Sequence, residues 1–454
     1  MTARPLRRGP GAAAPVRAVH LGLGSFFRAH QAWYTDRAGS RDGEDWGIAA
    51  FTGRRPDLAD ALTAQDGLYT LVTRAPDGDR FDVVRSVVRA HAAADTGAWL
   101  DLLADPAVRV VTTTVTEAGY ARRPDGALDT GAPQVARDLA ALRADPRAAV
   151  GSVPARLVAG LLARRATDAG PLTLVPCDNL PDNGAALAGV VREFAAAVDP
   201  TLPDWIGAHV ATATTMVDRI TPEPTPEDVA TVRAATGTDD RAPVVTEPFS
   251  EWVVAGAFPG GRPAWERAGA VLTDDVTPFE QRKLWLLNGG HSLLAYVGGL
   301  RGCTSVAEAV ADEHCAALLR QWWAVCIPYL SVPRDEAERY CAALLERFAN
   351  PRMRHALAQI ATDGSQKLPV RLLPVLRLER AAGRLPAPVV AVLGAWVAHL
   401  SGSGLPVRDV RAEELRHLTG DVARALAALD PALADDAELV GAVRAETAGL
   451  LGRR

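Results

Sequence analysis

The strongest constraint on the fold is a change of sequence pattern near residues 270–277. Before this point, short β-branched runs alternate with alanine-rich helical stretches, which is typical of a parallel sheet with connecting helices. Beyond Gly302 strand signals nearly vanish, and helical patterns rich in Ala, Leu, Arg and Glu continue to the C-terminus. We therefore predict an α/β fold whose first domain spans residues 17–275 and whose second, mainly helical domain spans 276–454, after a flexible tail at 1–16.

Composition excludes several classes of protein. A formal charge of -5, with no cluster of Lys and Arg among aromatic residues, argues against a nucleic-acid partner. The longest apolar run, Val389–Leu400, is too short to span a bilayer. Five cysteines without a CxxC pair predict free thiols in a reducing compartment instead of disulfides or a metal site. Without a signal-peptide pattern, we expect a cytoplasmic protein, monomeric or a small homo-oligomer, whose partner is a small molecule.

A glycine turn follows the first predicted strand. The strand Arg17–Leu21 ends at Gly22-Leu-Gly24, and a helical stretch begins directly afterwards. Strand, glycine turn and helix form the layout of a Rossmann dinucleotide site, where glycines let a pyrophosphate approach the helix N-terminus. The third glycine of the fingerprint is replaced by Phe27, so a plain tight turn remains an alternative.

The second predicted strand, Trp46–Phe51, bears on the choice of cofactor. Such a strand usually ends in an acidic residue that binds the ribose hydroxyls. Here the chain continues Thr52-Gly53-Arg54-Arg55 instead. We expect NAD as the cofactor, and NADP is possible because these arginines could bind a 2′-phosphate; alternatively both are solvated.

Further strands are predicted along the first domain. Leu68–Arg74 and Phe81–Arg89 read as a hairpin, and His209–Val217 as one strand before Asp218. Other predicted strands are Val108–Val115, Leu172–Pro176, Val244–Glu247 and Ala268–Leu272. Thr116 and Asn179 each follow a buried strand, at the edge where open α/β sheets bind ligands. Alone, such an Asn is more often a turn former or helix N-cap than a substrate ligand.

The segment Thr277–Gly302 is predicted to be an amphipathic helix, because apolar residues recur at three- and four-residue spacing. Lys283, Asn288 and His291 interrupt its apolar pattern. At about 100° per residue, one helix can direct all three into the same cleft. Gly289 and Gly290 lie between them, which suggests that another group approaches the helix backbone closely. The alternative is a solvated polar face with tolerated glycines.

Several motifs, in order, resemble blocks of one enzyme family. They are HLGLGSFFRAHQAWY, AQDGLYTLVTR, VTEAGY, PCDNLPDNG, MVDRITP, VVTEPFSEWV, KLWLLNGGHSLLAYVGGLRG, RFANPRMRH and IATDGSQKLP. With these motifs the chain resembles the mannitol dehydrogenase family, the long-chain polyol dehydrogenases that include fructuronate and tagaturonate reductases. The resemblance implies a metal-independent oxidoreductase that interconverts a secondary alcohol and a ketone with a nicotinamide cofactor, using residues of both domains.

The resemblance also implies roles for individual residues. Lys283 corresponds to the general base, Asn179 and Asn288 to the pair that holds the substrate oxygen, and His291 to a substrate hydrogen-bonder. Glu280 corresponds to a glutamate that helps pass the proton to solvent. The motifs also place Gly22, Gly24, Phe26, Arg28 and Asp218 at the cofactor and Lys367 at the substrate. From their places in the sequence we add Arg54 and Thr116 for the cofactor, and Gln359 for the substrate.

Departures from the family pattern bear on the substrate. Gln359 stands where the family usually has an arginine, and Thr212–Thr215 replaces a typical F-P-N-S or F-P-N-T. Because a carboxylated substrate would need an extra cation, we favour mannitol and fructose over D-mannonate and fructuronate. The open alternatives are such a sugar-acid reductase, a hydroxyacid dehydrogenase of the 6-phosphogluconate type, and a non-catalytic nucleotide-binding regulator.

Overall fold

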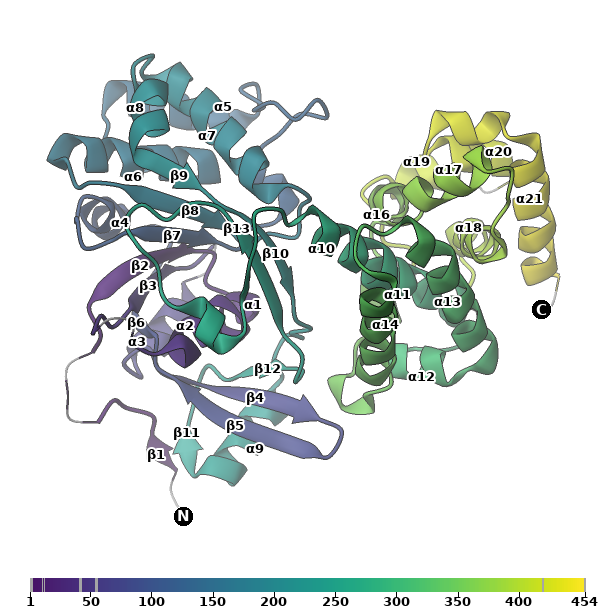
Figure 1. Cartoon of the computed structure of the whole chain (residues 1–454), viewed down its shortest axis with the longest axis horizontal. Helices are drawn as coiled ribbons and strands as arrows, with labels where there is room; N and C mark the ends of the chain where they lie inside the picture. Colours follow the sequence, from purple (N-terminus) through teal and green to yellow (C-terminus); the bar gives the residue numbers. More distant parts are fainter. Residues whose placement is uncertain are drawn as a thin grey trace. The chain divides into compact units, whose positions relative to one another are not determined.

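The computed structural model describes residues 3–9, 11, 13–40, 43–53, 56–418 and 420–452. The chain divides into two compact units, Met1–Thr277 and Pro278–Arg454, which we call unit 1 and unit 2 (Figure 1). Arg54 and Arg55, the predicted 2′-phosphate ligands, lie outside the described residues.

Unit 1 is organised around a six-stranded sheet with the order β6-β3-β2-β7-β8-β9. Its strands are β2 (Val16–Leu21), β3 (Gly47–Phe51), β6 (Val87–His91), β7 (Val110–Thr113), β8 (Leu172–Pro176) and β9 (Val210–Thr212). All neighbouring pairs in this sheet are parallel. Counted along the chain, the order is 3-2-1-4-5-6, that of the Rossmann fold, with the reversal between β2 and β7. The predicted fold class is therefore confirmed for unit 1.

Residues of β2 alternate between two apolar cores, as the period of a strand requires. Val19 and Leu21 belong to a core shared with helices α4 to α8, whereas Ala18 packs with Phe27, Tyr34 and residues of the smaller sheets. In Figure 1, helices α5 to α8 lie on one side of the sheet. The helices of unit 1 are α1 (Ser25–Ala29), α2 (Gln31–Ala38), α3 (Asp57–Thr63), α4 (Thr96–Leu103), η1 (Glu117–Tyr120), α5 (Pro133–Ala144), α6 (Val153–Thr167), α7 (Asn183–Val198), α8 (Leu202–His209), α9 (Pro226–Thr236) and η2 (Trp265–Ala268).

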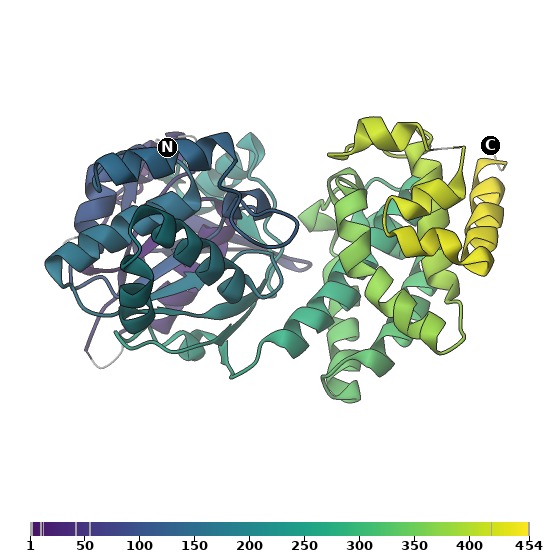
Figure 2. The same ribbon diagram turned by 90° about the horizontal axis from the view of Figure 1, so that it is seen from above.

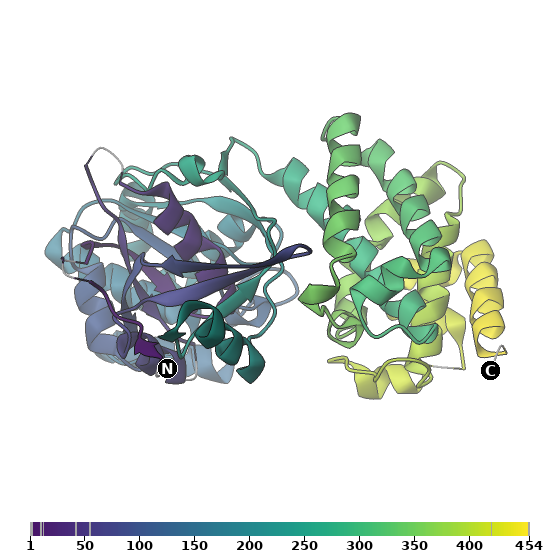
Figure 3. The ribbon, with the colours of Figure 1, turned by 90° about the horizontal axis from the view of Figure 1, so that it is seen from below.

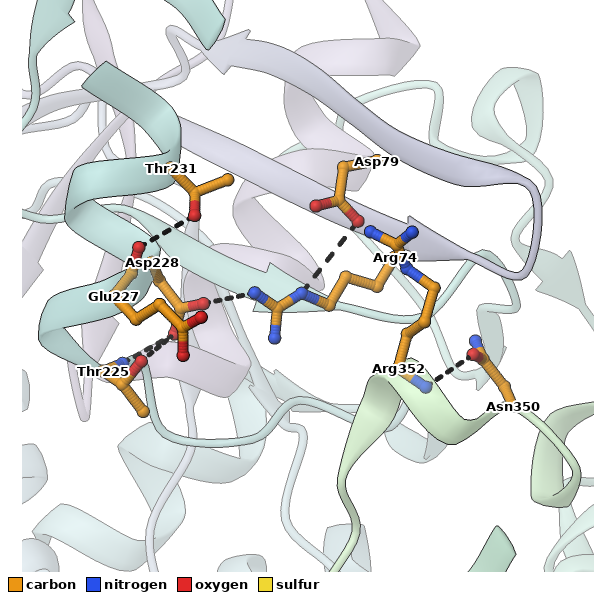
Figure 4. Close-up of polar contacts among 8 residues, drawn as sticks. All are labelled: Arg74, Asp79, Thr225, Glu227, Asp228, Thr231, Asn350 and Arg352. Atoms are coloured by element: carbon orange, nitrogen blue, oxygen red, sulfur yellow. Dashed lines mark hydrogen bonds and ion pairs between the residues drawn. The ribbon is translucent and has the colours of Figure 1, made fainter. Parts of the chain in front are cut away.

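Three smaller sheets complete unit 1. They join β4 (Tyr69–Ala75), β5 (Gly78–Val84) and β12 (Val244–Thr246); β10 (Thr214–Asp218), β13 (Glu251–Ala255) and β14 (Val271–Leu272); and β1 (Arg4–Pro5) with β11 (Thr238–Asp239). The guanidinium of Arg74 on β4 bonds to Asp228 of α9 and lies 4.0 Å from Asp79 of β5 (Figure 4). Because Asp228 also closes a capping box with Thr225, one buried carboxylate fixes the start of α9 and ties it to the β4–β5 ribbon.

Two predicted strands are each divided in the structure. The run Phe81–Arg89 contributes to both β5 and β6, because Asp36 accepts from the N–H of Arg85 at 2.6 Å and holds a turn between them. The run His209–Val217 begins at the end of α8 and supplies both β9 and β10. The side chain of Asn183 exchanges hydrogen bonds with the backbone of Thr215, which directs β10 into another sheet.

The predicted flexible tail also differs from the structure. Within it, β1 pairs with β11, and Leu6 is buried. The guanidinium of Arg8 donates to the carbonyl oxygens of Asp66, Arg85 and Val87. These contacts fasten the described part of the tail to unit 1, because an arginine can satisfy several carbonyls at once.

Every regular element described for unit 2 is a helix (Figure 2), and the same helices are seen from below in Figure 3. They are α10 (Thr277–Arg282), η3 (Lys283–Gly289), α11 (Gly290–Leu293), η4 (Leu294–Gly298), α12 (Val306–Ala311), α13 (Glu313–Cys326), η5 (Ile327–Tyr329), α14 (Arg334–Phe348), η6 (Pro351–Met353), α15 (Leu357–Ile360), α16 (Gly364–Arg371), α17 (Leu373–Ala381), α18 (Ala387–Leu400), α19 (Ala412–Arg416), α20 (Val422–Ala427), η7 (Pro431–Asp435) and α21 (Ala437–Leu451). Asn350 caps η6 by accepting from the N–H of Arg352 at 3.1 Å (Figure 4). Among the described helices, none has the length and apolar character needed to cross a bilayer.

Candidate active site

The glycine turn lies directly after β2, at the reversal of strand order. Gly22 has φ +114°, and a Cβ there would lie 2.2 Å from the carbonyl oxygen of Thr114. Only glycine meets both conditions. A Cβ on Gly24 would instead find only the oxygen of Gly22, at 3.5 Å, and the φ of Gly24 is an ordinary -143°. The fold therefore requires the first glycine, whereas the second leaves open space beside the turn.

A buried histidine, which the sequence did not single out, supports this turn. The ring of His20 contacts Thr112 Oγ1 at 2.8 Å and Thr114 Oγ1 at 3.0 Å, and stacks on Phe27 at 3.6 Å. Thr114 Oγ1 donates in turn to the carbonyl of Gly22 at 2.8 Å. Burial lowers the pKa of His20 to about 3, so the ring is neutral. The only sequence signal is a polar residue in an apolar strand just before the turn.

Two predicted cofactor residues follow the turn. Phe26 is half-buried and stacks on His30, with ring centroids 5.1 Å apart. Arg28 is buried, and its guanidinium donates to the backbone carbonyls of Gly24, Ala242 and Pro243. Burial lowers the pKa of Arg28. These contacts join α1 to the segment before β12, so Arg28 has a structural task, and its role in cofactor binding stays a prediction.

The predicted residues at other strand ends occupy different settings. Thr116 is exposed and precedes η1. Asp218 is buried at the end of β10, where its backbone lies opposite that of Glu251 in the antiparallel strand β13. The role of both residues in cofactor binding stays a prediction.

Asn179 is exposed in the loop after β8, and its neighbour Asp178 anchors that loop. The buried carboxylate of Asp178 accepts from Thr113 Oγ1 at 2.8 Å, from the N–H of Val115 at 2.5 Å and from the hydroxyl of Tyr120 at 2.5 Å. Burial raises the pKa of Asp178 against the opposing effect of these donors. Asp178 thus fixes the carboxyl ends of β7 and β8 together, a role that sequence reasoning missed although the residue adjoins a predicted site residue.

The predicted amphipathic helix of unit 2 is not a uniform α-helix. Residues Lys283–Gly289 and Leu294–Gly298 are wound as π-helix, whose hydrogen bonds join residue i to i+5. In an α-helix, Lys283 and Asn288 would be separated by about 140° around the axis. The backbone angles at Arg282, Gly289 and Gly290 nevertheless lie in the α region, and the N–H of Gly290 donates to the carbonyls of Leu286 and Leu287. The predicted helix is present from Thr277 to Gly298, and two segments within it are π-helix instead of regular α-helix.

The neighbours of Gly289 and Gly290 explain these two glycines. A Cβ on Gly289 would lie 2.8 Å from Nε1 of Trp322, and one on Gly290 would lie 2.8 Å from Cδ1 of Leu319. The group that approaches the helix backbone is therefore α13 of the same unit. The close approach expected from the sequence is present, and at these positions it is made by protein side chains.

His291 is buried one turn beyond Asn288. Its ring stacks on Phe348 at 4.5 Å and meets His355 edge-on at 4.9 Å. Burial, with the charges of nearby cationic side chains, holds the pKa of His291 well below its usual value. Its Nε2 is buried and has no partner among the described residues, so this atom is suited to a substrate hydroxyl.

Cationic side chains gather around α16. Lys367 donates from Nζ to the carbonyl of Ile360 at 3.3 Å, and burial lowers the pKa of Lys367 to about 8. Arg371, which the sequence did not indicate, donates to Ser292 Oγ at 3.1 Å and to the carbonyl of Asn288 at 3.4 Å. Gln359 is exposed on α15, and Glu280 is half-buried on α10, one turn before Lys283.

Family models match nearly the whole chain. The model of the mannitol dehydrogenase Rossmann domain matches residues 16–267, and that of the mannitol dehydrogenase C-terminal domain matches residues 275–446.

Curated relatives cover most of the chain. D-arabinitol 4-dehydrogenase of Ralstonia nicotianae is 40% identical over 86% of this chain and 84% of its own length. D-mannonate oxidoreductase of Escherichia coli is 36% identical over 94% and 92%. Mannitol 2-dehydrogenase of Cereibacter sphaeroides is 36% identical over 85% and 81%.

Two solved structures are similar over nearly the full length. Mannitol 2-dehydrogenase of Pseudomonas fluorescens, in a ternary complex with NAD and D-mannitol, has a TM-score of 0.85 and 33% identity, covering 100% of this chain and 95% of that chain. A substrate-free D-sorbitol dehydrogenase also has a TM-score of 0.85, with 30% identity over 97% and 94%.

Proposed function

The chain belongs to the mannitol dehydrogenase family of oxidoreductases, and from this premise we propose that it interconverts a polyol and its ketose with NAD. The predicted family and class of dehydrogenase are thereby confirmed. The choice of substrate, the lysine base and the individual residue roles are the proposal. The cytoplasmic location and the oligomeric state remain predictions.

The observation that carries the proposal is the placement of lysine. Of 49 Lys and Arg residues, lysine occupies only positions 283 and 367, and all other basic residues are arginine. Both positions coincide with site residues implied by the family motifs. An arginine stays protonated at any working pH, whereas a lysine can lose its proton when buried. One of the two lysines, Lys283, occupies the position that the family motifs assign to the base.

The nucleotide site fits the cofactor. The glycine turn lies at the reversal point of the Rossmann strand order, and a Cβ on Gly24 would meet a single atom within 4 Å, which supports the approach of a pyrophosphate there. When bound, the nicotinamide supplies hydride transfer at the substrate carbon. The described residues do not distinguish NAD from NADP, because Arg54 and Arg55 lie outside them.

The protein's own task is to move a proton and to hold the reacting oxygen. Lys283 takes the hydroxyl proton in polyol oxidation and returns it in ketose reduction, which requires its pKa to lie near about 7–8. Asn179 and Asn288 donate to the oxygen as negative charge develops, an effect of about 2.7–4 kcal/mol for a donor in comparable sites. His291, with Nε2 available, binds a neighbouring hydroxyl, and Glu280 passes the proton onward. None of these tasks requires a metal.

The substrate class has two candidates. The neutral Gln359 in place of the family's arginine favours a polyol such as mannitol with fructose as its ketose. Arg371 and Lys367 favour a carboxylated substrate, because neither forms an ion pair with a described carboxylate within 4 Å. This second candidate is the reduction of fructuronate to D-mannonate.

The test is a panel of ketoses and keto-acids assayed with NADH and NADPH in parallel, using wild type and Lys283→Ala. We expect ketose reduction by wild type and a loss of about 10²–10⁴-fold in the variant. Preference for keto-acids would select the second candidate. If wild type reduced nothing while still binding NADH, the regulator alternative would hold; full activity in Lys283→Ala would refute the lysine base.

A further inference from the structure

The π-wound segment η3 receives two indole hydrogen bonds from a neighbouring helix. Trp322 Nε1 donates to the carbonyl of Trp285 at 2.8 Å, and Trp323 Nε1 donates to the carbonyl of Leu286 at 2.9 Å. The donors are consecutive residues of α13, and the acceptors are consecutive residues of η3. Two adjacent indoles therefore bind two adjacent backbone carbonyls.

These hydrogen bonds lie in a dry interior. Trp322 is 0% exposed and Trp323 is 3% exposed. A buried donor that loses its acceptor, or a carbonyl that loses a donor, is costly because no water replaces it. Gly289 and Gly290 allow this approach, since a Cβ on either residue would collide with side chains of α13. The contact therefore depends on the glycines of one helix and on the tryptophans of the other.

The consequence concerns the spacing of the proposed catalytic groups. Lys283 begins η3 and Asn288 is its penultimate residue, five positions later. Both groups are therefore carried by the segment whose backbone carbonyls the two indoles bind. Trp323 also neighbours Phe348, at 6.5 Å between rings, and Phe348 stacks on His291. The two indoles therefore influence the positions of Lys283 and Asn288 through the backbone of η3, and that of His291 through Phe348.

We infer that Trp322 and Trp323 are positioning residues, whose indole N–H groups hold η3 against α13 and thereby set the positions of Lys283 and Asn288. The inference rests on the proposed function, because those two residues matter only if they act on the substrate. In this inference the two tryptophans contact neither substrate nor cofactor, and they determine the positions of the base Lys283 and the oxygen donor Asn288.

The experiment replaces each tryptophan with phenylalanine, which removes the N–H donor and keeps most of the ring. Trp265→Phe is the matched control: its Nε1 donates to Thr35 Oγ1 at 3.0 Å in unit 1, and the side chain is equally buried. Steady-state kinetics are measured for ketose reduction with NADH, and hydrogen exchange by mass spectrometry is measured across 283–290 of the folded full-length protein.

For Trp322→Phe and Trp323→Phe we expect a 10- to 100-fold lower kcat, since a displacement of about 1 Å can cost about 10²-fold. The KM for NADH should change less than twofold, and exchange across η3 should accelerate. Trp265→Phe should change neither kcat nor that exchange.

Three results would be decisive against this inference or its premise. Wild-type kcat together with wild-type exchange in both variants would overturn the positioning role. Faster exchange with unchanged kcat would also overturn it, leaving a purely structural contact. If Lys283→Ala were fully active, the proposed function itself would fail, and this result is independent of the tryptophan variants. Should one variant not fold, the other still supplies the test.

Discussion

The two glycines of the turn after β2 should respond to substitution in opposite ways. In Gly22→Ala, the residue would keep a φ near +114°, and its Cβ would lie 2.2 Å from the oxygen of Thr114. Backbone strain of this kind costs about 1–3 kcal/mol, and overpacking costs about 1–3 kcal/mol more. We therefore expect the free energy of unfolding to fall by about 2–6 kcal/mol.

Gly24→Ala carries no such penalty. Its φ of -143° suits any residue, and its Cβ would make one ordinary contact at 3.5 Å. Stability should change by less than about 0.5 kcal/mol. The added methyl would occupy the space that the pyrophosphate needs, so NADH should bind at least tenfold more weakly, a loss of about 1.4 kcal/mol.

The assays are urea unfolding followed by tryptophan fluorescence, and NADH binding by calorimetry. The reasoning predicts a stability defect in the first variant and a binding defect with normal stability in the second. If Gly24→Ala bound NADH as tightly as wild type, the turn would be a plain tight turn. If Gly22→Ala were as stable as wild type, the packing argument at Thr114 would be wrong.

Three further outcomes are expected. The pKa of His20 is about 3 in the folded protein and about 6.5 in the unfolded chain, so the free energy of unfolding should fall as the pH drops below about 6.5. The loss from this residue should be about 2 kcal/mol at pH 5. Urea titrations at pH 7 and pH 5 should show this loss in wild type and not in His20→Asn. Gly289→Ala should lower stability by about 1–3 kcal/mol through its clash with Trp322, and kcat should fall with it; a variant of wild-type stability and kcat would contradict the packing of η3. Asp178→Asn should lower the free energy of unfolding by about 1–3 kcal/mol for each donor left without an acceptor, and it should lower kcat by displacing Asn179. An unchanged kcat in a folded variant would contradict the role of Asp178 in placing Asn179.

The alternation of strands and helices in the first 275 residues was sufficient to predict the architecture, because a parallel sheet buried on both faces leaves a strong apolar signal. Strand boundaries were less accessible. The run Phe81–Arg89 contains four valines and reads as one strand, yet contacts from α2 divide it between two sheets: Asp36 accepts from the N–H of Arg85, and Ser86 Oγ donates to the carbonyl of Ala32. The division of His209–Val217 depends likewise on Asn183, a residue outside the run.

The candidate site shows the same limit. Motifs located Lys283, Asn288 and His291 on one helix, yet Trp322 and Trp323 donate hydrogen bonds to the backbone of that helix, a contact that no local pattern encodes. The glycines between them were correctly interpreted as a close approach, but the approaching group belongs to α13. His20 and Asp178 were missed for a similar reason, since their roles arise from contacts across neighbouring strands.

The central claim is that the amine of Lys283 loses its proton near neutral pH, and the scarcity of lysine makes this directly measurable. Protein labelled with ¹³C at lysine Cε gives only two side-chain signals, from positions 283 and 367, and Lys283→Arg assigns them. Titrated in the complex with NAD, the signal of Lys283 should report a pKa of about 7–8. A value at or above the ordinary lysine pKa of about 10.4 would contradict the account.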